Sequence, residues 1–329
     1  MIALVLSAIA SIALTRLVLE ILQRRAILDH PNERSSHTRP TPRGGGWGLV
    51  PVVLVAWLTL TAIGMPAPHG VIIIAAVAIA LMSLSWLDDL RGLSPALRLA
   101  AQGVAVIVGL ALLPPTALVL QGLLPLWADR VVTLLAWLWF VNLTNFMDGI
   151  DGISGSEIAA IGLGLAVAGN TAAGATLLSP FALTLTGAAL GFLVWNWHPA
   201  RLFLGDVGSV PLGFLTGWLL IQAAVAGLWL PALILPAYYL ADATITLARR
   251  AWRGERIWQA HREHFYQKAV GAGRRHDQVV LLISAANLLL ILCATTAVSL
   301  GAIMLVPAAV VVLILLVVLA RPLDGPPAP

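Results

Sequence analysis

The segment at residues 70–87, GVIIIAAVAIALMSLSWL, is an unbroken apolar run that is followed at once by Asp88 and Asp89. A helix of roughly 17–25 apolar residues is long enough to cross a hydrocarbon core of about 30 Å. The sequence therefore predicts a membrane-spanning helix at this point, with two carboxylates at its end.

The same apolar pattern extends along the whole chain of 329 residues, which is 60% hydrophobic and only 10% charged. A soluble protein of this length could not bury so much apolar side chain, and no alternating segments favour a membrane barrel. We therefore predict an all-α, polytopic integral membrane protein with one transmembrane domain over residues 1–329. About eleven spans are expected, near residues 1–22, 44–64, 70–87, 97–113, 130–147, 157–174, 178–196, 207–228, 230–248, 278–298 and 301–320.

Basic residues predict the orientation of these spans. Nearly all of the 19 Lys and Arg fall in alternate loops, which would share one side of the membrane. The positive-inside rule makes that side cytoplasmic, with the N-terminus outside and the C-terminus inside. The net charge of +4 reflects this topology and gives no reason to expect a nucleic-acid partner. The first span lacks a basic leading region, which favours an uncleaved anchor. The single cysteine, Cys293, excludes an intrachain disulfide and a thiolate metal site.

Acidic and polar motifs gather in the loops that are expected on this cytoplasmic side, near residues 23–43, 88–96, 142–156, 196–209 and 249–277. Carboxylates beside hydrocarbon repel one another unless a cation or a demanding set of hydrogen bonds holds them. A membrane carrier would instead need polar groups near the middle of its spans. The pattern therefore predicts a metal-dependent active site on one membrane face.

The pair Asp88 and Asp89 closes the third expected span. Two carboxylates at the C-terminal end of a helix oppose its macrodipole, so a structural role alone explains them poorly. Mg²⁺ prefers oxygen ligands, usually one or two carboxylates together with substrate phosphates. The pair is therefore suited to bind a metal with one carboxylate and to face a substrate with the other, although a solvated helix end is the alternative.

The most specific motif is NLTNFMDGIDG at residues 142–152. Asn142, Asn145 and Asp148 are spaced by three, so they would share one face of a continuing helix. The two glycines that follow are expected to break the helix and let the backbone approach a ligand. A simple cap and turn would explain Asp151 but would leave the two asparagines unexplained.

A second loop, NWHPARLFLGDVGS at residues 196–209, leads into the eighth expected span. Asp206 would begin that helix, and helix N-termini bind phosphate well. Arg201 lies close by in the sequence, and an exposed Phe203 could stack on a nucleobase. The alternatives are an ordinary helix cap for Asp206 and an interfacial aromatic for Phe203.

The most basic loop contains His261, Arg262, Glu263 and His264. Histidines three apart would share a helix face, and imidazoles beside guanidinium groups suit a diphosphate or sugar hydroxyls. The lack of thiols favours a hard cation over Zn²⁺. A basic surface helix near anionic lipid is the alternative. Asp242, inside the ninth expected span, is either functional or a helix-packing and ion-pair residue.

Together with DHPNERSSHTRPTPRGGG at residues 29–46, these motifs occur in the order found in a known family. The chain resembles the polyprenyl-phosphate N-acetylhexosamine-1-phosphate transferases, relatives of phospho-MurNAc-pentapeptide transferase, over residues 29 to about 268. The resemblance implies ten or eleven spans in the bacterial inner membrane and an active site on the cytoplasmic face. It implies transfer of a sugar-1-phosphate from a UDP-N-acetyl sugar to undecaprenyl phosphate, with release of UMP and with Mg²⁺, or Mn²⁺ as a substitute. Membrane lipid is a further partner, and a homodimer is left open.

The resemblance also implies roles for individual residues. Asp88, Asp89 and Asp206 would be catalytic, with Asp206 and Asp89 as the metal ligands. Substrate would be bound by Asn142, Asn145, Asp148, Asp151, Asn196, Arg201, Phe203, His261, Arg262 and His264, with Phe203 stacking on uracil. We expect direct attack of the lipid phosphate on the β-phosphorus, with Asp88 positioning or deprotonating the acceptor; a covalent aspartyl-phosphate route is the alternative.

The last loop bears on the identity of the sugar. The peptidoglycan branch of the family carries adjacent histidines, whereas Arg262 and Glu263 separate the two histidines of this chain. This difference favours the branch that initiates O-antigen or related envelope glycans. UDP-GlcNAc is the default donor and a 6-deoxy amino sugar remains open. The alternatives are MurNAc-pentapeptide-1-phosphate transfer and a non-enzymatic membrane carrier.

Overall fold

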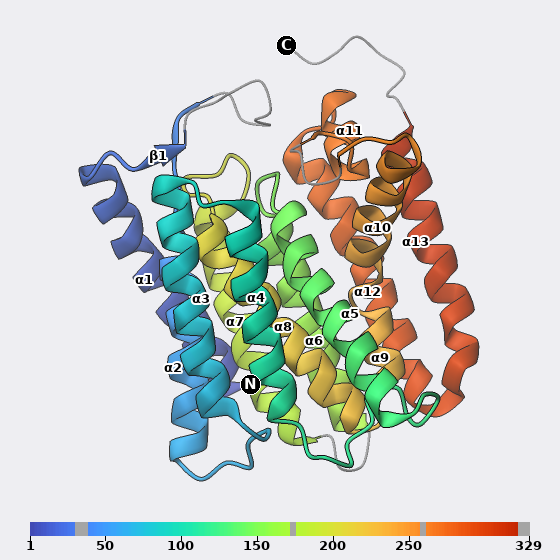
Figure 1. Cartoon of the computed structure of the whole chain (residues 1–329). Coiled ribbons are helices and arrows are strands. Elements are labelled where there is room, and N and C mark those ends of the chain that lie inside the picture. Colours follow the sequence, from blue (N-terminus) through green and yellow to red (C-terminus); the bar gives the residue numbers. More distant parts are fainter. Residues whose placement is uncertain (30–38, 172–175, 257–260, 322–329) are drawn as a thin grey trace.

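Helices make up nearly all of the chain, as the apolar runs predict (Figure 1). The computed structural model describes residues 1–29, 39–171, 176–256 and 261–321. The long helices are α1 (Ile2–Arg24), α2 (Gly46–Ala62), α3 (Val71–Arg91), α4 (Pro95–Ala111), α5 (Leu126–Phe146), α6 (Ile153–Thr171), α7 (Ser179–Asn196), α8 (Asp206–Val225), α10 (Ala237–Trp252), α12 (His276–Leu300) and α13 (Leu305–Ala320). The short elements are β1 (Leu28–Asp29), β2 (Thr41–Pro42), η1 (Thr176–Leu178), α9 (Trp229–Ile234), α11 (Phe265–Gly271) and η2 (Gly301–Met304).

The prediction of an all-α polytopic membrane protein is confirmed. Within the described residues, 7 helical segments are long and apolar enough to cross a membrane, and the last of them, His276–Ala320, covers two of the predicted spans. Helices α2 and α4 are apolar but shorter. Figure 1 shows α1 starting at the lower end of the bundle and α13 ending at the upper end. The count of eleven spans and their orientation stay predictions.

The ninth predicted span, residues 230–248, is not one helix. It consists of α9 and α10, and the break falls at residues 235–236. Pro236 has no N–H to donate to the preceding turn, and its ring clashes with that turn, so the helix cannot continue through it. Asp242 consequently lies near the middle of a separate helix, α10, where it is fully buried.

Helix α8 is the core of the bundle and contacts α2, α3, α5, α6 and α9. Almost every residue along it is buried. The first residue of α2 approaches it closely, because a Cβ atom on Gly46 would lie only 2.3 Å from the Cα atom of Gly208. Helix α8 therefore begins, at Asp206, in the middle of one end of the bundle.

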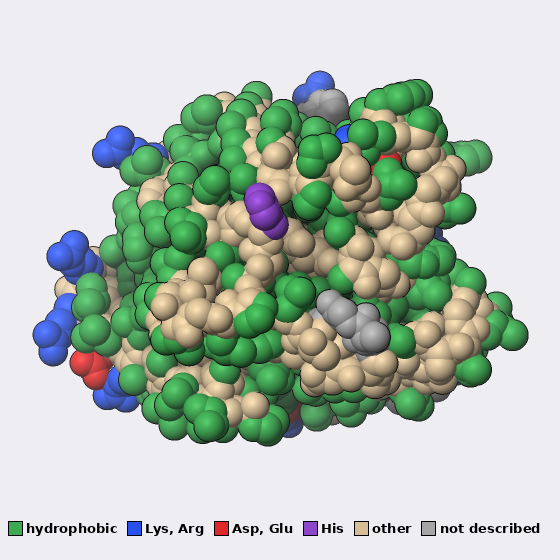
Figure 2. All heavy atoms as spheres, turned by 90° about the horizontal axis from the view of Figure 1, so that it is seen from below, with side chains coloured by type: hydrophobic (Ala, Val, Ile, Leu, Met, Phe, Trp, Pro, Cys, Tyr) green, Lys and Arg blue, Asp and Glu red, His purple; other side chains and the backbone are tan. Residues whose placement is uncertain are grey.

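The two ends of the bundle differ in character. In Figure 1, β1 and α11 lie at the upper end, where α3 and α5 end and α8 begins. Figure 2 shows the opposite end, whose surface is mainly hydrophobic and neutral with few charged side chains. The loops that carry the polar motifs are thus at one end of the molecule.

Candidate active site

Two arginines join the three aspartates that the sequence analysis predicts to be catalytic. The Nη2 atom of Arg43 lies 2.7 Å from Oδ1 of Asp89 and 2.7 Å from Oδ1 of Asp206. The Nη1 atom of Arg98 lies 2.9 Å from Oδ2 of Asp88 and 3.6 Å from Oδ2 of Asp206. These five residues, called here the carboxylate–arginine cluster, come from four separate parts of the chain.

Backbone pairing places Arg43 beside Asp206. The N–H of Phe203 donates to the carbonyl of Pro42 at 2.8 Å, and Arg43 forms an isolated parallel bridge with Phe203. Burial by itself would lower the pKa of Arg43, but the carboxylates of Asp89 and Asp206 raise it above the usual value. Arg43 therefore remains a cation between two carboxylates.

Asp89 acts mainly as an anchor for α8. Its Oδ1 accepts the N–H of Asp206 at 3.2 Å and its Oδ2 accepts the N–H of Val207 at 3.0 Å. These N–H groups are in the first turn of α8, where no intrahelical acceptor exists. With the ion pair to Arg43, the Asp89 side chain, which is only 3% exposed, has most of its acceptor positions occupied.

Asp206 has the most available carboxylate of the cluster and is 17% exposed. Its Oδ2 is 3.6 Å from Arg98, which is beyond a good hydrogen bond. Carboxylate oxygens are the ligands that Mg²⁺ prefers. The donor set therefore fits a hard divalent cation held by Asp206, with Asp89 as the second predicted ligand.

A cavity of about 430 Å³ extends from the carboxylate–arginine cluster into the bundle. Asp88, Arg98, Asn142, Asn145 and Asp206 line its polar part. All five lie close to the helix ends that form the upper end of the bundle. The cavity therefore offers charge and hydrogen-bonding groups at one end.

The rest of the cavity is lined mainly by apolar side chains. They include Leu81, Leu84, Leu99, Leu135, Leu138, Trp139, Phe146, Val210 and Leu247. Leu99 on α4 and Leu135 on α5 are 49% and 58% exposed, so the cavity opens on the side of the bundle between these helices. The site is thus accessible from the direction of the lipid as well as from the polar end.

Asn142 and Asn145 are on one face of α5, as predicted, and both line the cavity. The amide of Asn145 donates to the Ser209 hydroxyl at 2.9 Å and so connects α5 with α8. The amide of Asn142 donates to the carbonyl of Leu138 in its own helix at 2.8 Å, which leaves its amide oxygen for other partners.

The prediction that Asp148 continues this helix face is wrong. Helix α5 ends at Phe146, and residues 147–152 form a turn in which Gly152 has φ +81°. The helix thus ends earlier than the three-residue spacing suggests, and the positive φ of Gly152 favours glycine in the turn that follows. Burial raises the pKa of Asp148 to about 7, against the opposing effect of a hydrogen bond with Ser154.

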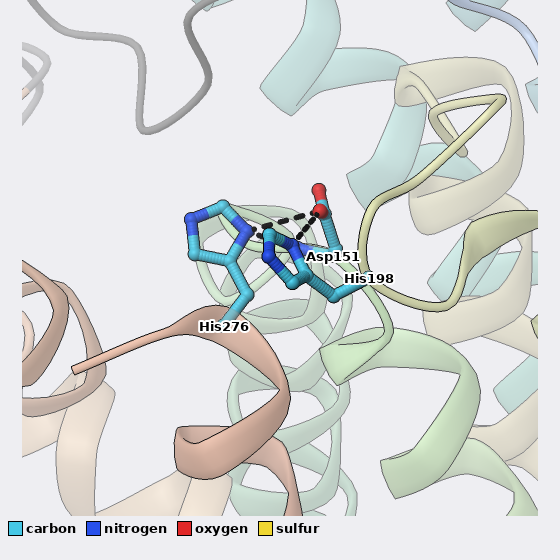
Figure 3. A group of neighbouring side chains, drawn as sticks. All are labelled: Asp151, His198 and His276. Carbon is cyan, nitrogen blue, oxygen red and sulfur yellow. Dashed lines mark hydrogen bonds and ion pairs between the residues drawn. The ribbon is translucent and has the colours of Figure 1, made fainter. Parts of the chain in front are cut away.

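Asp151 belongs to a different cluster (Figure 3). Its Oδ2 lies 2.6 Å from Nδ1 of His198 and 3.2 Å from Nδ1 of His276, and it accepts the N–H of Ala200 at 3.1 Å. Burial would raise the pKa of Asp151, but the two imidazoles lower it below its usual value. Within the described part of the chain, these three side chains have ligand atoms within 4.8 Å of one another. The N–H of Asp151 also donates to Nδ1 of His276 at 3.3 Å. We therefore assign the group as a tie between two loops and the start of α12.

Asn196 strengthens this tie. Its Oδ1 accepts the N–H of Gly152 at 3.0 Å, and its Nδ2 donates to the carbonyl of Leu202 at 2.9 Å. The guanidinium of Arg201 lies 5.7 Å from the centre of the Trp195 ring. The positive charge beside Asp206 therefore comes from the two arginines of the carboxylate–arginine cluster. Phe203 is half-buried, and the roles of these residues in substrate binding stay predictions.

The two histidines of the last loop lie together, but they do not share a helix face as predicted. Helix α11 begins only at Phe265, so His261 and His264 both precede it. Their rings stack with centroids 4.9 Å apart. Burial, with a contribution from His264, lowers the pKa of His261 to about 4. Arg262 is exposed between them. Residues 30–38 of the first motif lie outside the described residues.

Residues 261–264 are called here the histidine loop. Tyr266, in the first turn of α11, connects this loop to the turn that carries Asp148. Its hydroxyl donates to the carbonyl of Phe146 at 3.0 Å. The same hydroxyl lies against Gly149, where an added Cβ atom would be only 2.2 Å from it. The histidine loop is therefore docked on the turn at residues 147–152.

Gly149→Ala is expected to lower the free energy of unfolding by about 1–3 kcal/mol, because the new methyl group overlaps the hydroxyl of Tyr266. Thermal unfolding of the detergent-solubilised protein measures this change. Gly103→Ala is the matched control, since its Cβ meets no described atom within 4 Å. Combining Gly149→Ala with Tyr266→Phe should recover part of the loss, and a Gly149→Ala protein as stable as wild type would contradict the packing.

Sequence reasoning counted Arg43 and Arg98 only as topology charges and did not place them in the site. A signal for Arg98 was available, because Ser94 and Pro95 form a typical helix start one turn before it. The signal for Arg43 was its position directly before three glycines. His198 lies inside the motif at residues 196–209, but its pairing with Asp151 had no local signal. His276 and Tyr266 lie outside the motifs, and only the fold brings them there.

Comparison with known proteins identifies the family to which the chain is similar. The profile of glycosyl transferase family 4 matches residues 71–224. The chain is 28% identical over 295 residues, 84% of this chain and 80% of the relative, to a probable undecaprenyl-phosphate N-acetylglucosaminyl 1-phosphate transferase of Bacillus subtilis. It is 30% identical over 293 residues, 76% of this chain and 70% of the relative, to a decaprenyl-phosphate N-acetylglucosaminephosphotransferase of Mycolicibacterium smegmatis. It is 32% identical over 230 residues, 62% of this chain and 60% of the relative, to a phospho-N-acetylmuramoyl-pentapeptide-transferase of Microcystis aeruginosa. A helical membrane bundle with these motifs at one end, and this extent of similarity, place the chain in glycosyl transferase family 4.

Proposed function

We propose that the protein transfers an N-acetylhexosamine-1-phosphate group from a UDP-sugar to a polyprenyl phosphate at the cytoplasmic face of the bacterial inner membrane. Undecaprenyl phosphate is the proposed acceptor, and UDP-GlcNAc or a 6-deoxy amino sugar is the proposed donor. The product would be an undecaprenyl-diphosphate-sugar, which would initiate O-antigen or another envelope glycan. The names of the relatives support the reaction class.

The cavity beside the carboxylate–arginine cluster is the observation that carries this proposal. A polyprenyl phosphate is a hydrocarbon chain that ends in a phosphate, and the cavity combines an apolar lining with charged and polar side chains. Arg98 lines the cavity and can offer charge-assisted hydrogen bonds to a phosphate. The opening between α4 and α5 would let the lipid enter from the bilayer.

Asp88 fits a role in positioning Arg98. Its Oδ1 accepts the N–H of Leu93 at 2.6 Å and its Oδ2 is paired with Arg98 at 2.9 Å, so both oxygens have partners. A phosphate monoester is already largely ionised at neutral pH, because its second pKa is about 6. The acceptor therefore needs orientation more than it needs a strong base.

In the proposed reaction an oxygen of the lipid phosphate attacks the β-phosphorus of the UDP-sugar, and the bond from that phosphorus to the bridging oxygen breaks to release UMP. Mg²⁺, held by Asp206 and Asp89, would neutralise charge on the diphosphate. Arg98 would hold the acceptor phosphate in line. The turn at residues 147–152, Phe203 and the histidine loop would hold the nucleotide and the sugar.

Transfer of MurNAc-pentapeptide-1-phosphate is the second candidate, since several relatives carry that name. We place it second because the two histidines of the last loop are not adjacent. Glu263, which separates the two histidines, is ion-paired with Arg253, and this pair helps to shape the loop. A non-enzymatic carrier is disfavoured because the chain belongs to a family of transferases.

We expect the purified protein to release UMP from one member of a panel of UDP-N-acetyl sugars when undecaprenyl phosphate and Mg²⁺ are both present. Removal of the metal with EDTA should lower release to background, and added Mg²⁺ should restore it, because the carboxylates would otherwise lack the cation that screens the diphosphate. Omitting the lipid is the matched control. Exchange of labelled UMP into the UDP-sugar without lipid would support the covalent route. If folded protein releases no UMP from any sugar in the panel, the proposed function is contradicted.

A further inference from the structure

Asp242 is a fully buried carboxylate that contacts the histidine loop from inside the bundle. It lies on α10 with 0% of its surface exposed. Its Oδ1 lies 3.0 Å from Nδ1 of His264 and accepts the N–H of Phe265 at 3.0 Å. Its Oδ2 accepts the N–H of Tyr266 at 3.3 Å. One side chain thus contacts three consecutive residues, the last residue of the loop and the first two of α11.

These contacts determine which nitrogen of His264 carries a proton. Both oxygens of Asp242 already accept a backbone N–H, which is the pattern of an ionised carboxylate. An ionised carboxylate has no proton to give, so the short contact with His264 requires Nδ1–H to be the donor. The other nitrogen, Nε2, is then the ring atom that remains for a ligand.

His261, which stacks on His264, has the opposite arrangement. The N–H of Glu263 donates to Nδ1 of His261 at 3.3 Å, so this Nδ1 is an acceptor. With its pKa lowered to about 4, His261 is neutral at pH 7 and its proton is on Nε2. The Nε2 atoms of the two stacked rings therefore differ. Nε2 of His261 carries a proton and can donate, whereas Nε2 of His264 is the nitrogen that does not contact Asp242.

The same carboxylate also holds the loop against the rest of the site. Phe265 and Tyr266 are the first two residues of α11, and their N–H groups have no acceptor within that helix. Tyr266 in turn reaches Phe146 at the end of α5. Asp242 is therefore connected through one residue to the turn at residues 147–152.

We propose that Asp242 is a positioning residue that fixes the orientation and the tautomer of His264, so that Nε2 of His264 meets the diphosphate or sugar of the donor. This inference rests on the proposed function for the identity of that ligand. Asp242 itself would touch no substrate, because it is fully buried. At metal sites, a carboxylate that orients a histidine ligand in this way commonly contributes about 10- to 100-fold to affinity or activity, and we expect an effect of that size here.

Histidine NMR of the wild-type protein tests the tautomer without any assay of activity. The chain has 7 histidines, so ¹⁵N-histidine labelling gives few signals, and His264→Ala identifies the signals of His264. We expect His264 to carry its proton on Nδ1. In Asp242→Asn the amide can donate to Nδ1, and the proton should move to Nε2. A wild-type His264 with its proton on Nε2, or a tautomer that is unchanged in Asp242→Asn, would overturn the proposal.

A double-mutant cycle distinguishes positioning from simple structural support. Asp242→Asn is expected to lower kcat about 10- to 100-fold with KM values near those of wild type. In the presence of His264→Ala the same change should have little further effect, because Asp242 acts through His264. Tyr238→Phe, which removes a different donor to Asp242 at 3.2 Å, is the matched control and should leave the tautomer unchanged.

If the free-energy equivalents of the kcat losses in Asp242→Asn and His264→Ala add fully in the double mutant, Asp242 is structural support and the positioning role is excluded. If the wild-type protein releases no UMP from any sugar, the proposed function fails, while the NMR result still decides the arrangement of Asp242 and His264. The two failures are therefore distinguishable.

Discussion

Asp206→Asn is expected to lower the rate of UMP release by about 10³-fold or more, a loss of about 4 kcal/mol in transition-state stabilisation. The substitution keeps the shape of the side chain but removes its charge. The proposed metal ligand is lost, and Arg43 and Arg98 lose one of their carboxylate partners. Initial rates at saturating substrate, measured over a range of Mg²⁺ concentrations, give the size of the effect.

The matched control for this variant is Asp129→Asn, at the opposite end of the bundle. Asp129 is a buried carboxylate that accepts the backbone N–H groups of Val119 and Leu120 and is not in the carboxylate–arginine cluster. Its replacement should lower thermal stability while the folded fraction keeps its rate. If the rate of Asp206→Asn is within tenfold of the wild-type rate, Asp206 has no essential role in the reaction.

Arg98→Ala should lower kcat/KM for the lipid acceptor by about 10²- to 10³-fold. This is less than the roughly 10³- to 10⁵-fold effect of an arginine that stabilises a transferring phosphoryl group, because Arg98 would hold the acceptor phosphate. Arg98 lies between Asp88 and Asp206 and lines the cavity. Arg98→Lys should retain part of the activity, because it keeps the charge but not the planar pair of donors. Kinetics with varied polyprenyl phosphate separate the effect on acceptor binding from the effect on turnover.

Arg91→Ala is the control for loss of a positive charge nearby, since Arg91 is exposed at the end of α3 and does not line the cavity. This variant should behave like wild type. An Arg98→Ala enzyme whose KM and kcat for the acceptor are both unchanged would mean that the phosphate binds elsewhere.

Most of the fold follows from the sequence because a bilayer leaves the backbone few options. Long apolar segments must satisfy their backbone hydrogen bonds internally, so they become helices. The prediction failed at Pro236, where hydropathy continued but a helix could not. Hydropathy indicates that a segment lies in the membrane, but it does not indicate whether the helix is broken within that segment.

The candidate site was less accessible to sequence reasoning, because its contacts join residues that are distant in the chain. Arg43 and Asp206 are 163 positions apart, and no local pattern indicates their pairing. Helical spacing was a good guide for Asn142 and Asn145, which are within a long helix. It misled for His264, because α11 begins one residue later and the position of the ring depends on Asp242.

The sideways opening of the cavity between α4 and α5 makes the membrane the reservoir for one of the two proposed substrates. A polyprenyl phosphate that enters there is encountered in two dimensions, so its effective concentration is its mole fraction among the lipids. The nucleotide sugar arrives from water in three dimensions. Dilution of the bilayer with inert lipid would therefore lower the mole fraction of the acceptor, and with it the rate, even when the total amount of acceptor in the sample is unchanged.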